Sequence, residues 1–178
     1  MRLFVALDLP SSVRAQLAAL SGSGIPGARW VPPENYHLTL RFIGDIPGHV
    51  ARDVDDALLA LRARGFTLTL TGMGTFSKGG ISNALWVGAE KTPSLDHLRQ
   101  KIETALQRCG LEPERRKFQP HVTLARLDNP AEAKVAAFVQ AHNLFRTEPL
   151  AIEHFTLFSS LLCKEHAVYT PEAEYELA

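Results

Sequence analysis

His37-Leu38-Thr39-Leu40 is a short stretch that the chain repeats in form at His121-Val122-Thr123-Leu124. Side chains alternate between the two faces of a strand, so each histidine would share a face with the threonine two residues later. The aliphatic residues between them would point to the opposite face, where helices can bury them. Each stretch therefore predicts a strand that presents an imidazole and a hydroxyl to the same side.

The repeat extends well beyond these two tetrapeptides. An apolar strand pattern followed by a helix that starts at Pro and Ser occurs at residues 3–20 and again at 85–107. A turn with proline, a helical stretch and an alternating strand pattern then follow each tetrapeptide. Matching elements keep an offset of about 82 to 84 residues, which is typical of a duplication. The predicted repeat units are approximately residues 1–82 and 83–178.

Two copies of a strand–helix–strand–helix–strand unit predict an α+β fold. We expect two lobes related by a pseudo-two-fold axis, each a mainly antiparallel sheet with helices on its outer face. The other faces of the two sheets would then meet at a cleft. At 178 residues the chain can bury a core of its own, so we expect one bilobal domain over residues 1–178.

Composition narrows the function classes only a little. Lys+Arg and Asp+Glu each number 19, so the net charge does not indicate a nucleic-acid-binding protein. Any RNA contact would need a local basic patch such as Arg115-Arg116-Lys117. Cys109 and Cys163 lack CxxC spacing, and the apolar run near the first residue is too short for a signal peptide. We therefore expect reduced thiols, a cytoplasmic location and no membrane contact.

The two His-Thr pairs are the strongest candidates for chemistry. Pseudo-symmetry would bring them together across the cleft, where Thr39 and Thr123 could hold the oxygens of a phosphate diester. His37 and His121 could then act on opposite sides of phosphorus, one taking a proton and the other giving one. Histidine suits both roles because its ordinary pKa is about 6.5. The other histidines lack this pattern and are interpreted as structural.

Other chemistries fit the sequence less well. The chain contains neither HExxH nor paired-cysteine spacing for zinc, no GxxxxGK[ST] loop for nucleotide phosphates and no GxSxG motif. We expect no metal and no cofactor. Spacing alone leaves a Ser–His–Asp triad open.

At these residues the chain closely resembles the two-histidine phosphoesterase superfamily. Within it, the resemblance is to the RNA 2',3'-cyclic phosphodiesterases, the LigT-like proteins also called 2'-5' RNA ligases. The matching segments are residues 2–6, 29–31, 35–44, 118–126 and 158–161, with Tyr169 beyond them. The resemblance implies a phosphate site between the lobes and hydrolysis of RNA 2',3'-cyclic phosphate ends to 2'-phosphomonoesters. It also implies that His37 is the general acid and His121 the general base, although pseudo-symmetry makes these roles easy to exchange.

The resemblance further implies that Arg126 binds phosphate. Arg126 is an odd number of residues from His121, so an ideal strand would point it away from the cleft, and a bulge would have to redirect it. Arg41 lies four residues after His37 and is expected on the same face, as a candidate substrate contact or as a solvated cation at the sheet edge. Phe42 could stack on a base, but the alternation that faces Arg41 to the cleft favours a position in the core for Phe42.

Two aromatic residues complete the predicted site. Phe118 could stack on a base or belong to the core. Tyr169 could line the cleft or be a core or edge tyrosine.

Three other interpretations of function stay open beside hydrolysis. The same cleft could join or cleave 2'-5' linkages, or serve as a non-catalytic RNA- or nucleotide-binding module. An unrelated α+β interaction protein would require both motifs to be coincidence. We expect a monomer that acts on RNA with 2',3'-cyclic phosphate ends.

Overall fold

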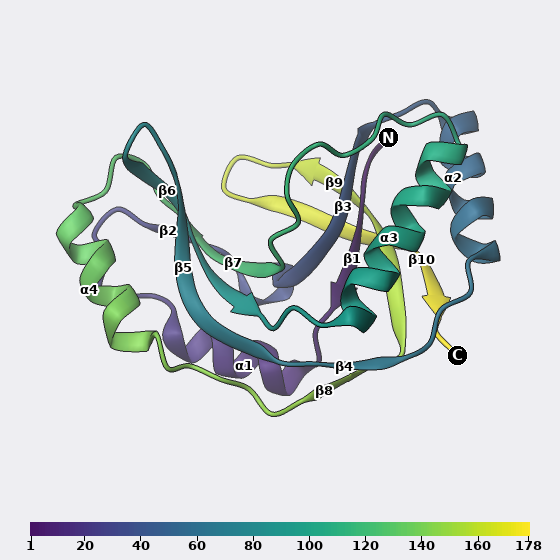
Figure 1. The fold of residues 1–178 in the computed structure, drawn as a ribbon. Helices are drawn as coiled ribbons and strands as arrows, with labels where there is room; N and C mark the ends of the chain where they lie inside the picture. Colours follow the sequence, from purple (N-terminus) through teal and green to yellow (C-terminus); the bar gives the residue numbers. More distant parts are fainter.

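Two antiparallel four-stranded sheets form the centre of the computed structural model, which describes residues 1–178 (Figure 1). The first sheet has the order β10-β9-β1-β3, with β1 (Arg2–Asp8), β3 (His37–Asp45), β9 (His154–Leu162) and β10 (Ala167–Glu176). The second has the order β2-β7-β6-β5, with β2 (Arg29–Trp30), β5 (Leu70–Lys78), β6 (Ile81–Ala89) and β7 (His121–Arg126). A short third sheet pairs β4 (Phe66–Leu68) with β8 (Leu150–Ile152) and runs along the bottom of Figure 1.

Each large sheet takes strands from both halves of the chain. In the first sheet, β1 and β3 come from the first repeat and β9 from the second. In the second sheet, β6 and β7 come from the second repeat and β5 from the first. The predicted α+β class with antiparallel sheets is confirmed. The two lobes do not correspond to the two halves of the sequence, because the third strand of each repeat, β5 or β9, joins the sheet of the other repeat.

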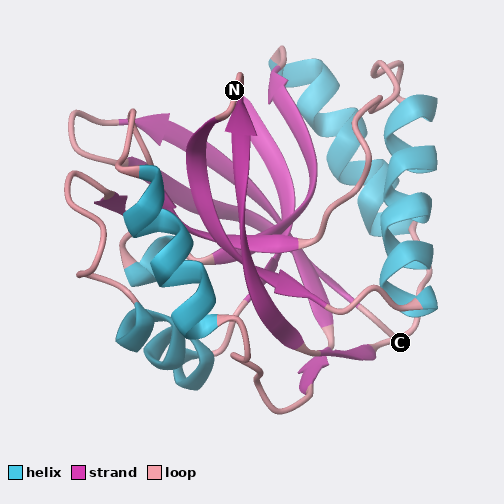
Figure 2. Ribbon diagram, turned by 60° about the vertical axis from the view of Figure 1, so that its left-hand side comes forward, coloured by secondary structure: helices cyan, strands magenta, loops and turns pink.

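The helices cover the sheets in two pairs. α1 (Ser11–Leu20) and α4 (Glu132–His142) lie on one side, and α2 (Gly48–Ala60) and α3 (Pro93–Arg108) on the other (Figure 2). α3 packs against α2, β3 and β4, and α4 packs against β5 and β6. α3 begins where the Thr92 hydroxyl accepts a hydrogen bond from the Leu95 amide, with Pro93 in the first turn. Each helix pair thus also combines the two halves.

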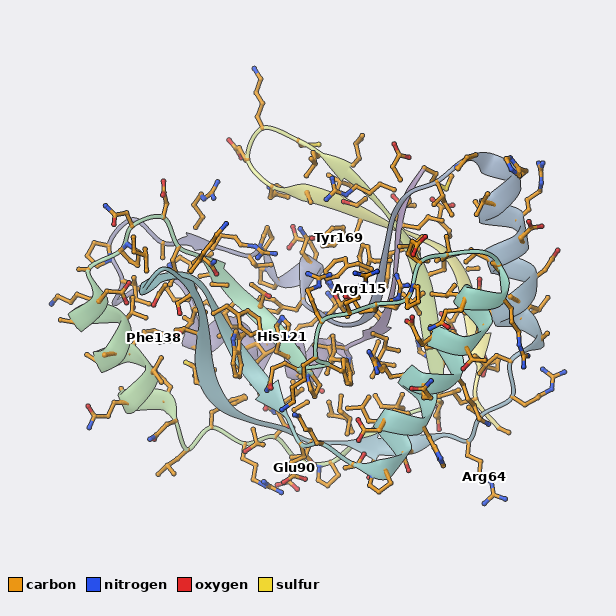
Figure 3. All side chains as sticks on the ribbon, turned by 45° about the horizontal axis from the view of Figure 1, so that its top comes forward. Arg64, Glu90, Arg115, His121, Phe138 and Tyr169 are labelled. Carbon is orange, nitrogen blue, oxygen red and sulfur yellow. The ribbon has the colours of Figure 1, made fainter.

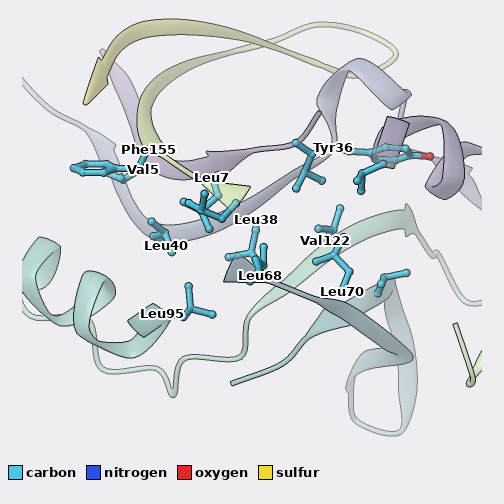
Figure 4. Packing of buried hydrophobic residues seen from close by; sticks show 14 of the residues in the cluster. Val5, Leu7, Tyr36, Leu38, Leu40, Leu68, Leu70, Leu95, Val122 and Phe155 are labelled. Atoms are coloured by element: carbon cyan, nitrogen blue, oxygen red, sulfur yellow. The ribbon is translucent and has the colours of Figure 1, made fainter. Parts of the chain in front are cut away.

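One hydrophobic core connects the two sheets. Leu38 and Leu40 of β3 and Val122 and Leu124 of β7 are all buried in it, as their alternation with the histidines and threonines predicts. Figure 4 shows Leu38, Leu40 and Val122 in this core. α3 contributes an apolar stripe of Leu95, Leu98, Ile102 and Leu106. A short 3-10 turn, η1 (Pro33–Asn35), leads into β3, and the Tyr36 ring after it is buried as well. The apolar faces of both motif strands are therefore anchored in the same core.

A β-bulge interrupts each motif strand at the same place. Ala6 pairs with Thr39 and Val5 with Arg41, so Leu40 is the extra residue in β3. Trp86 pairs with Thr123 and Leu85 with Ala125, so Leu124 is the extra residue in β7. A bulge reverses the alternation of faces beyond it. Side chains after Leu40 and Leu124 therefore point opposite to what a regular strand predicts.

Candidate active site

His37 and His121 are oriented by the same local contact. The Nδ1 of His37 lies 2.7 Å from the Asn35 carbonyl oxygen, and the Nδ1 of His121 lies 2.6 Å from the Gln119 carbonyl oxygen. A carbonyl can only accept a hydrogen bond, so each Nδ1 carries the proton that is donated. Each neutral imidazole therefore keeps Nε2 as an unprotonated nitrogen that can take up or release a proton.

The two imidazoles open into one cleft of about 810 Å³. Thr39 and Thr123 line the cleft beside them, so the four residues of the two motifs are brought together. His121 and Tyr169 lie near the middle of the molecule in Figure 3, whereas Arg64 and Glu90 lie at its periphery.

Equivalent aromatic rings surround the two imidazoles. The centroids of Phe4 and Phe158 lie 4.9 and 6.3 Å from that of His37. Trp86 and Phe76, their counterparts in the other repeat, lie 5.9 and 4.8 Å from His121.

Tyr169 adds a wall on one side only. Its ring stands edge-on to His37, with 5.1 Å between centroids and 89° between planes. His37 is therefore the more enclosed of the two histidines.

Burial and positive charge favour neutral imidazoles. Burial is the main cause that lowers the pKa of His37 to about 4; the Asn35 carbonyl opposes this, while His121, Arg14 and Arg126 lower the pKa further. Burial is also the main cause that lowers the pKa of His121. The hydrogen bond to the Gln119 carbonyl raises this pKa, and the positive charge of Arg126 lowers it further. At pH 7 both Nε2 atoms are therefore acceptors.

The cleft is far more positive than the chain as a whole. Its lining includes five fixed cations and one carboxylate, namely Arg2, Arg29, Arg116, Arg126 and Lys164 with Glu165. The formal net charge of the chain is zero at pH 7. Such a concentration of one sign attracts a polyanion.

The bulge at Leu124 turns Arg126 into the cleft. A phosphate-binding role for Arg126 depended on such a bulge, because a regular strand would point its side chain away. Arg126 pairs in register with Arg29 of β2, and both line the cleft. Tyr169 lines it as well. Their contacts with a substrate stay predictions.

The expected position of Arg41 is wrong, and so is the core position that the alternation favoured for Phe42. The bulge at Leu40 turns Arg41 away from His37 and buries it, 8% exposed, with its Nε 2.6 Å from the Glu103 carboxylate. The same bulge puts Phe42 at the cleft, 50% exposed. A regular alternation cannot reveal a one-residue insertion.

Phe118 packs against the edge of the core, and the Arg99 guanidinium lies 5.3 Å from its ring centroid. It lines a second cavity of about 320 Å³ beside the cleft rather than the cleft itself.

Apart from Tyr169, the aromatic walls were not predicted from the sequence, and neither were most of the cleft cations. Phe76 and Phe158 stand at equivalent repeat positions, and so do Phe4 and Trp86, 82 residues apart. A search of the duplication for paired aromatic residues beside the motif strands would have found them. Nothing in the local sequence indicated Arg2 or Lys164, which reach the cleft from its rim.

No group of three or more His, Cys, Asp or Glu side chains is placed to hold a metal ion. None of the helices combines the length and the apolar character that crossing a membrane requires.

Known proteins resemble this chain over most or nearly all of its length. An RNA 2',3'-cyclic phosphodiesterase of Escherichia coli (strain K12) is 30% identical over 179 residues, which are 99% of this chain and 96% of that relative. One of Geobacillus stearothermophilus is 34% identical over 128 residues, 69% of this chain but 41% of the relative, so the match spans less than half of that protein.

A solved structure shows the same fold. The crystal structure of E. coli LigT complexed with 3'-AMP superposes with a TM-score of 0.82 at 28% identity, covering 99% of this chain and 98% of that one. The family model described as the 2'-5' RNA ligase superfamily matches residues 9–161. The chain therefore belongs to the 2'-5' RNA ligase superfamily.

Proposed function

We propose that this chain is an RNA 2',3'-cyclic phosphodiesterase that leaves 2'-phosphomonoester ends. The observation that carries the proposal is the pair of His-x-Thr motifs in one cationic cleft, each with its imidazole Nδ1 held by a backbone carbonyl. Two Nε2 atoms are thereby available for proton transfer. The relatives that carry this name support the choice of substrate.

The reaction is an in-line displacement at phosphorus. The hydroxyls of Thr39 and Thr123 and the guanidinium of Arg126 hold the non-bridging oxygens of the cyclic phosphate. A water oxygen bonds to phosphorus while the bond from phosphorus to O3' breaks. His121 takes a proton from the water and His37 gives one to O3'. The product keeps its phosphate on O2', and no metal ion is required.

The assignment of His37 as the acid must account for its low pKa. Little of His37 is protonated at pH 7 when its pKa is about 4. A bound phosphate anion raises the pKa of both imidazoles because it stabilises their charged forms. Coulombic attraction is stronger where the dielectric constant is lower, so the more enclosed His37 gains more from the anion. Binding of the substrate is thus what makes His37 an acid.

The first test is a product assay on a synthetic dinucleotide with a 2',3'-cyclic phosphate end. We expect turnover that survives EDTA and gives a 2'-phosphate, identified by ³¹P NMR. General acid–base catalysis contributes roughly 10²- to 10⁴-fold, so His37→Ala and His121→Ala should each lose activity on that scale. His49→Ala, which changes an exposed histidine of α2, is the matched control. Turnover that requires a metal ion would contradict the proposal.

A second test separates the roles of the two histidines. In a cyclic substrate with sulfur in place of O3', the leaving thiolate needs no proton. His37→Ala should then lose much less activity on the sulfur substrate than on the oxygen substrate, whereas His121→Ala should lose the same on both. The reverse pattern would exchange the two roles.

The same assay distinguishes the other interpretations. If the 5'-hydroxyl of a second RNA replaces water as the nucleophile, the product is a 2'-5' linkage, and its accumulation would identify a ligase. Tight binding of RNA ends without product would identify a binding module. Both motifs come from a single chain, which supports the expected monomer.

A further inference from the structure

A second cavity of about 320 Å³ opens beside the cleft. The two cavities share Thr39, Phe42, Phe76, Arg116 and His121 as lining residues. A strand whose last phosphate lies between the two histidines can therefore continue from one cavity into the other.

The residues that line only the second cavity include three cations, one aromatic ring and one carboxylate, namely Arg41, Arg99, Lys117, Phe118 and Glu114. Arg99 of α3 lies over the Phe118 ring, with its Cζ 5.3 Å from the centroid. At the border with the cleft, Arg116 lies over Phe42 at 5.8 Å. Lys117 is exposed beside them. Aromatic rings with guanidinium groups are the surfaces on which proteins stack unpaired bases.

The charges of this cavity are also available to a ligand. Neither Arg99 nor Lys117 is part of an ion pair. Arg116 is paired with Glu114, at 3.1 Å. Two free cations beside aromatic rings complement a phosphodiester with its attached base.

The wall of the cavity is held in place before any ligand arrives. Arg41, beneath the cavity, forms a buried pair with Glu103 of α3. Arg41 also donates to the Glu112 carbonyl, and the Glu103 carboxylate accepts from the Glu114 amide at 2.9 Å. The segment that carries Arg116, Lys117 and Phe118 is thereby fixed against α3, which lowers the entropy cost of binding.

We propose that the second cavity binds the nucleotide on the 5' side of the cyclic-phosphate end, so that the substrate is an oligonucleotide rather than a cyclic mononucleotide. The base stacks on the aromatic rings, and the phosphodiester that links the last two nucleotides is bound by Arg99 and Lys117. This inference rests on the proposed phosphodiesterase function.

The test compares a nucleoside 2',3'-cyclic phosphate with a dinucleotide that ends in the same group. Stacking of one base on an aromatic platform supports a preference of roughly tenfold or more in kcat/KM for the dinucleotide. Arg99→Ala and Lys117→Ala should each lower this preference, because each removes a contact with the linking phosphodiester. The value for the mononucleotide should stay within about twofold, because both residues lie outside the cleft. Arg64→Ala removes the same charge from an exposed site at the periphery (Figure 3) and should leave both values unchanged.

Two results would overturn the inference. Equal kcat/KM for both substrates in the unmodified chain means that no second nucleotide is recognised. An equal loss on both substrates in Arg99→Ala and Lys117→Ala would assign the cavity to the terminal nucleotide instead.

Binding separates this inference from the proposed function. If neither substrate is turned over, the phosphodiesterase function fails, and affinities for adenosine 2'-phosphate and the adenylyl dinucleotide with a 2'-phosphate still test the cavity. Arg99→Ala should weaken only the dinucleotide, and the plot of log affinity against log salt should become shallower by about 0.7 for the lost phosphate contact. Unchanged dinucleotide affinity in both variants would overturn the inference independently of catalysis.

Discussion

Arg41 and Glu103 form a buried ion pair across 62 positions of sequence, with the Arg41 Nε 2.6 Å from the Glu103 Oε2. Both side chains are less than a tenth exposed. The pair joins β3 to α3 and, through hydrogen bonds to residues 112 and 114, fixes the connection that leads to His121. An ion pair outside the cleft thus holds the strand that carries His37 against the segment that leads to His121.

Removing one partner of this pair should be costly. Glu103→Ala leaves the Arg41 charge buried and unpaired, which typically lowers the free energy of unfolding by about 3–5 kcal/mol. Urea unfolding at pH 7 measures it. The double variant Arg41→Met/Glu103→Leu should recover most of the loss, because it leaves no unpaired charge. A loss below about 1 kcal/mol in Glu103→Ala would place the pair with weak surface pairs.

The same carboxylate should make stability depend on acid. Burial raises the pKa of Glu103, but hydrogen bonds from Arg41, Gln107 and the Glu114 amide outweigh it and lower the pKa from 4.5 to about 2. The stabilisation is therefore complete above about pH 4.5 and is lost as the pH falls toward 2. Glu103→Gln should flatten the stability curve over this interval, and an unchanged curve would contradict the assignment.

Tyr169 should control the pKa of His37. Tyr169→Ala opens the wall of the cleft on that side, so the pKa of His37 should rise from about 4 toward 6.5 as burial decreases. NMR titration of the His37 imidazole measures the change. Tyr169→Phe keeps the edge-on ring and should keep the low pKa. Equal effects of the two variants would assign the shift to the hydroxyl instead of burial.

Arg126 should contribute both to phosphate binding and to the electrostatics of the two histidines. A hydrogen bond to a charged group is worth about 1.5–3 kcal/mol, so Arg126→Gln should lower kcat/KM roughly 10- to 150-fold. The pKa values of His37 and His121 should both rise, because a positive charge that opposes their protonation is removed. Arg126→Lys keeps the charge and should keep both pKa values low. A rise in only one of them would mean that Arg126 does not lie between the histidines.

Gly74 should be intolerant of any side chain. A Cβ on Gly74 would lie 2.5 Å from the indole ring of Trp86, which borders His121. Gly74→Ala must displace the indole, and overpacking of this kind costs roughly 1–3 kcal/mol of stability. Thermal unfolding measures the cost, and the imidazole NMR signals of His121 should shift with it. Gly48→Ala has open space around it and is the matched control. Equal melting temperatures for the two variants would contradict the packing argument.

Local patterns in the sequence were enough to place the motif strands and their apolar faces. The alternation at His37 and Thr39 and the duplicate at His121 and Thr123 predicted four residues that the structure brings into one cleft. The bulges at Leu40 and Leu124 could not be predicted from such patterns. An extra residue reverses which face of the strand the following side chains point to, but it leaves no mark in the residue types. For Arg126, the predicted phosphate contact disagreed with the direction that a regular strand would give its side chain, which indicated a bulge. For Arg41, a regular strand and the expected substrate contact agreed, so nothing indicated a bulge.

Long-range pairing was the second limit. Nothing near Arg41 indicates Glu103 as its partner, and nothing near β1 indicates β9 as its neighbour. Such choices depend on which surfaces complement each other in three dimensions. The second cavity follows from these contacts and was not predicted. The sequence indicated only the basic patch at residues 115–117 and Phe118 as a residue that could stack on a base.

The exchange of third strands has a consequence for how the protein is made. During synthesis β1 and β3 emerge early, but β9, the other neighbour of β1, begins only at His154. One edge of the first sheet therefore waits unpaired until most of the chain has left the ribosome, and pairings this distant in sequence form slowly. Phe158, which borders His37, arrives with that last hairpin. A nascent chain truncated before β9 thus carries both His37 and His121 but lacks Phe158 and Tyr169, the aromatic residues that enclose His37.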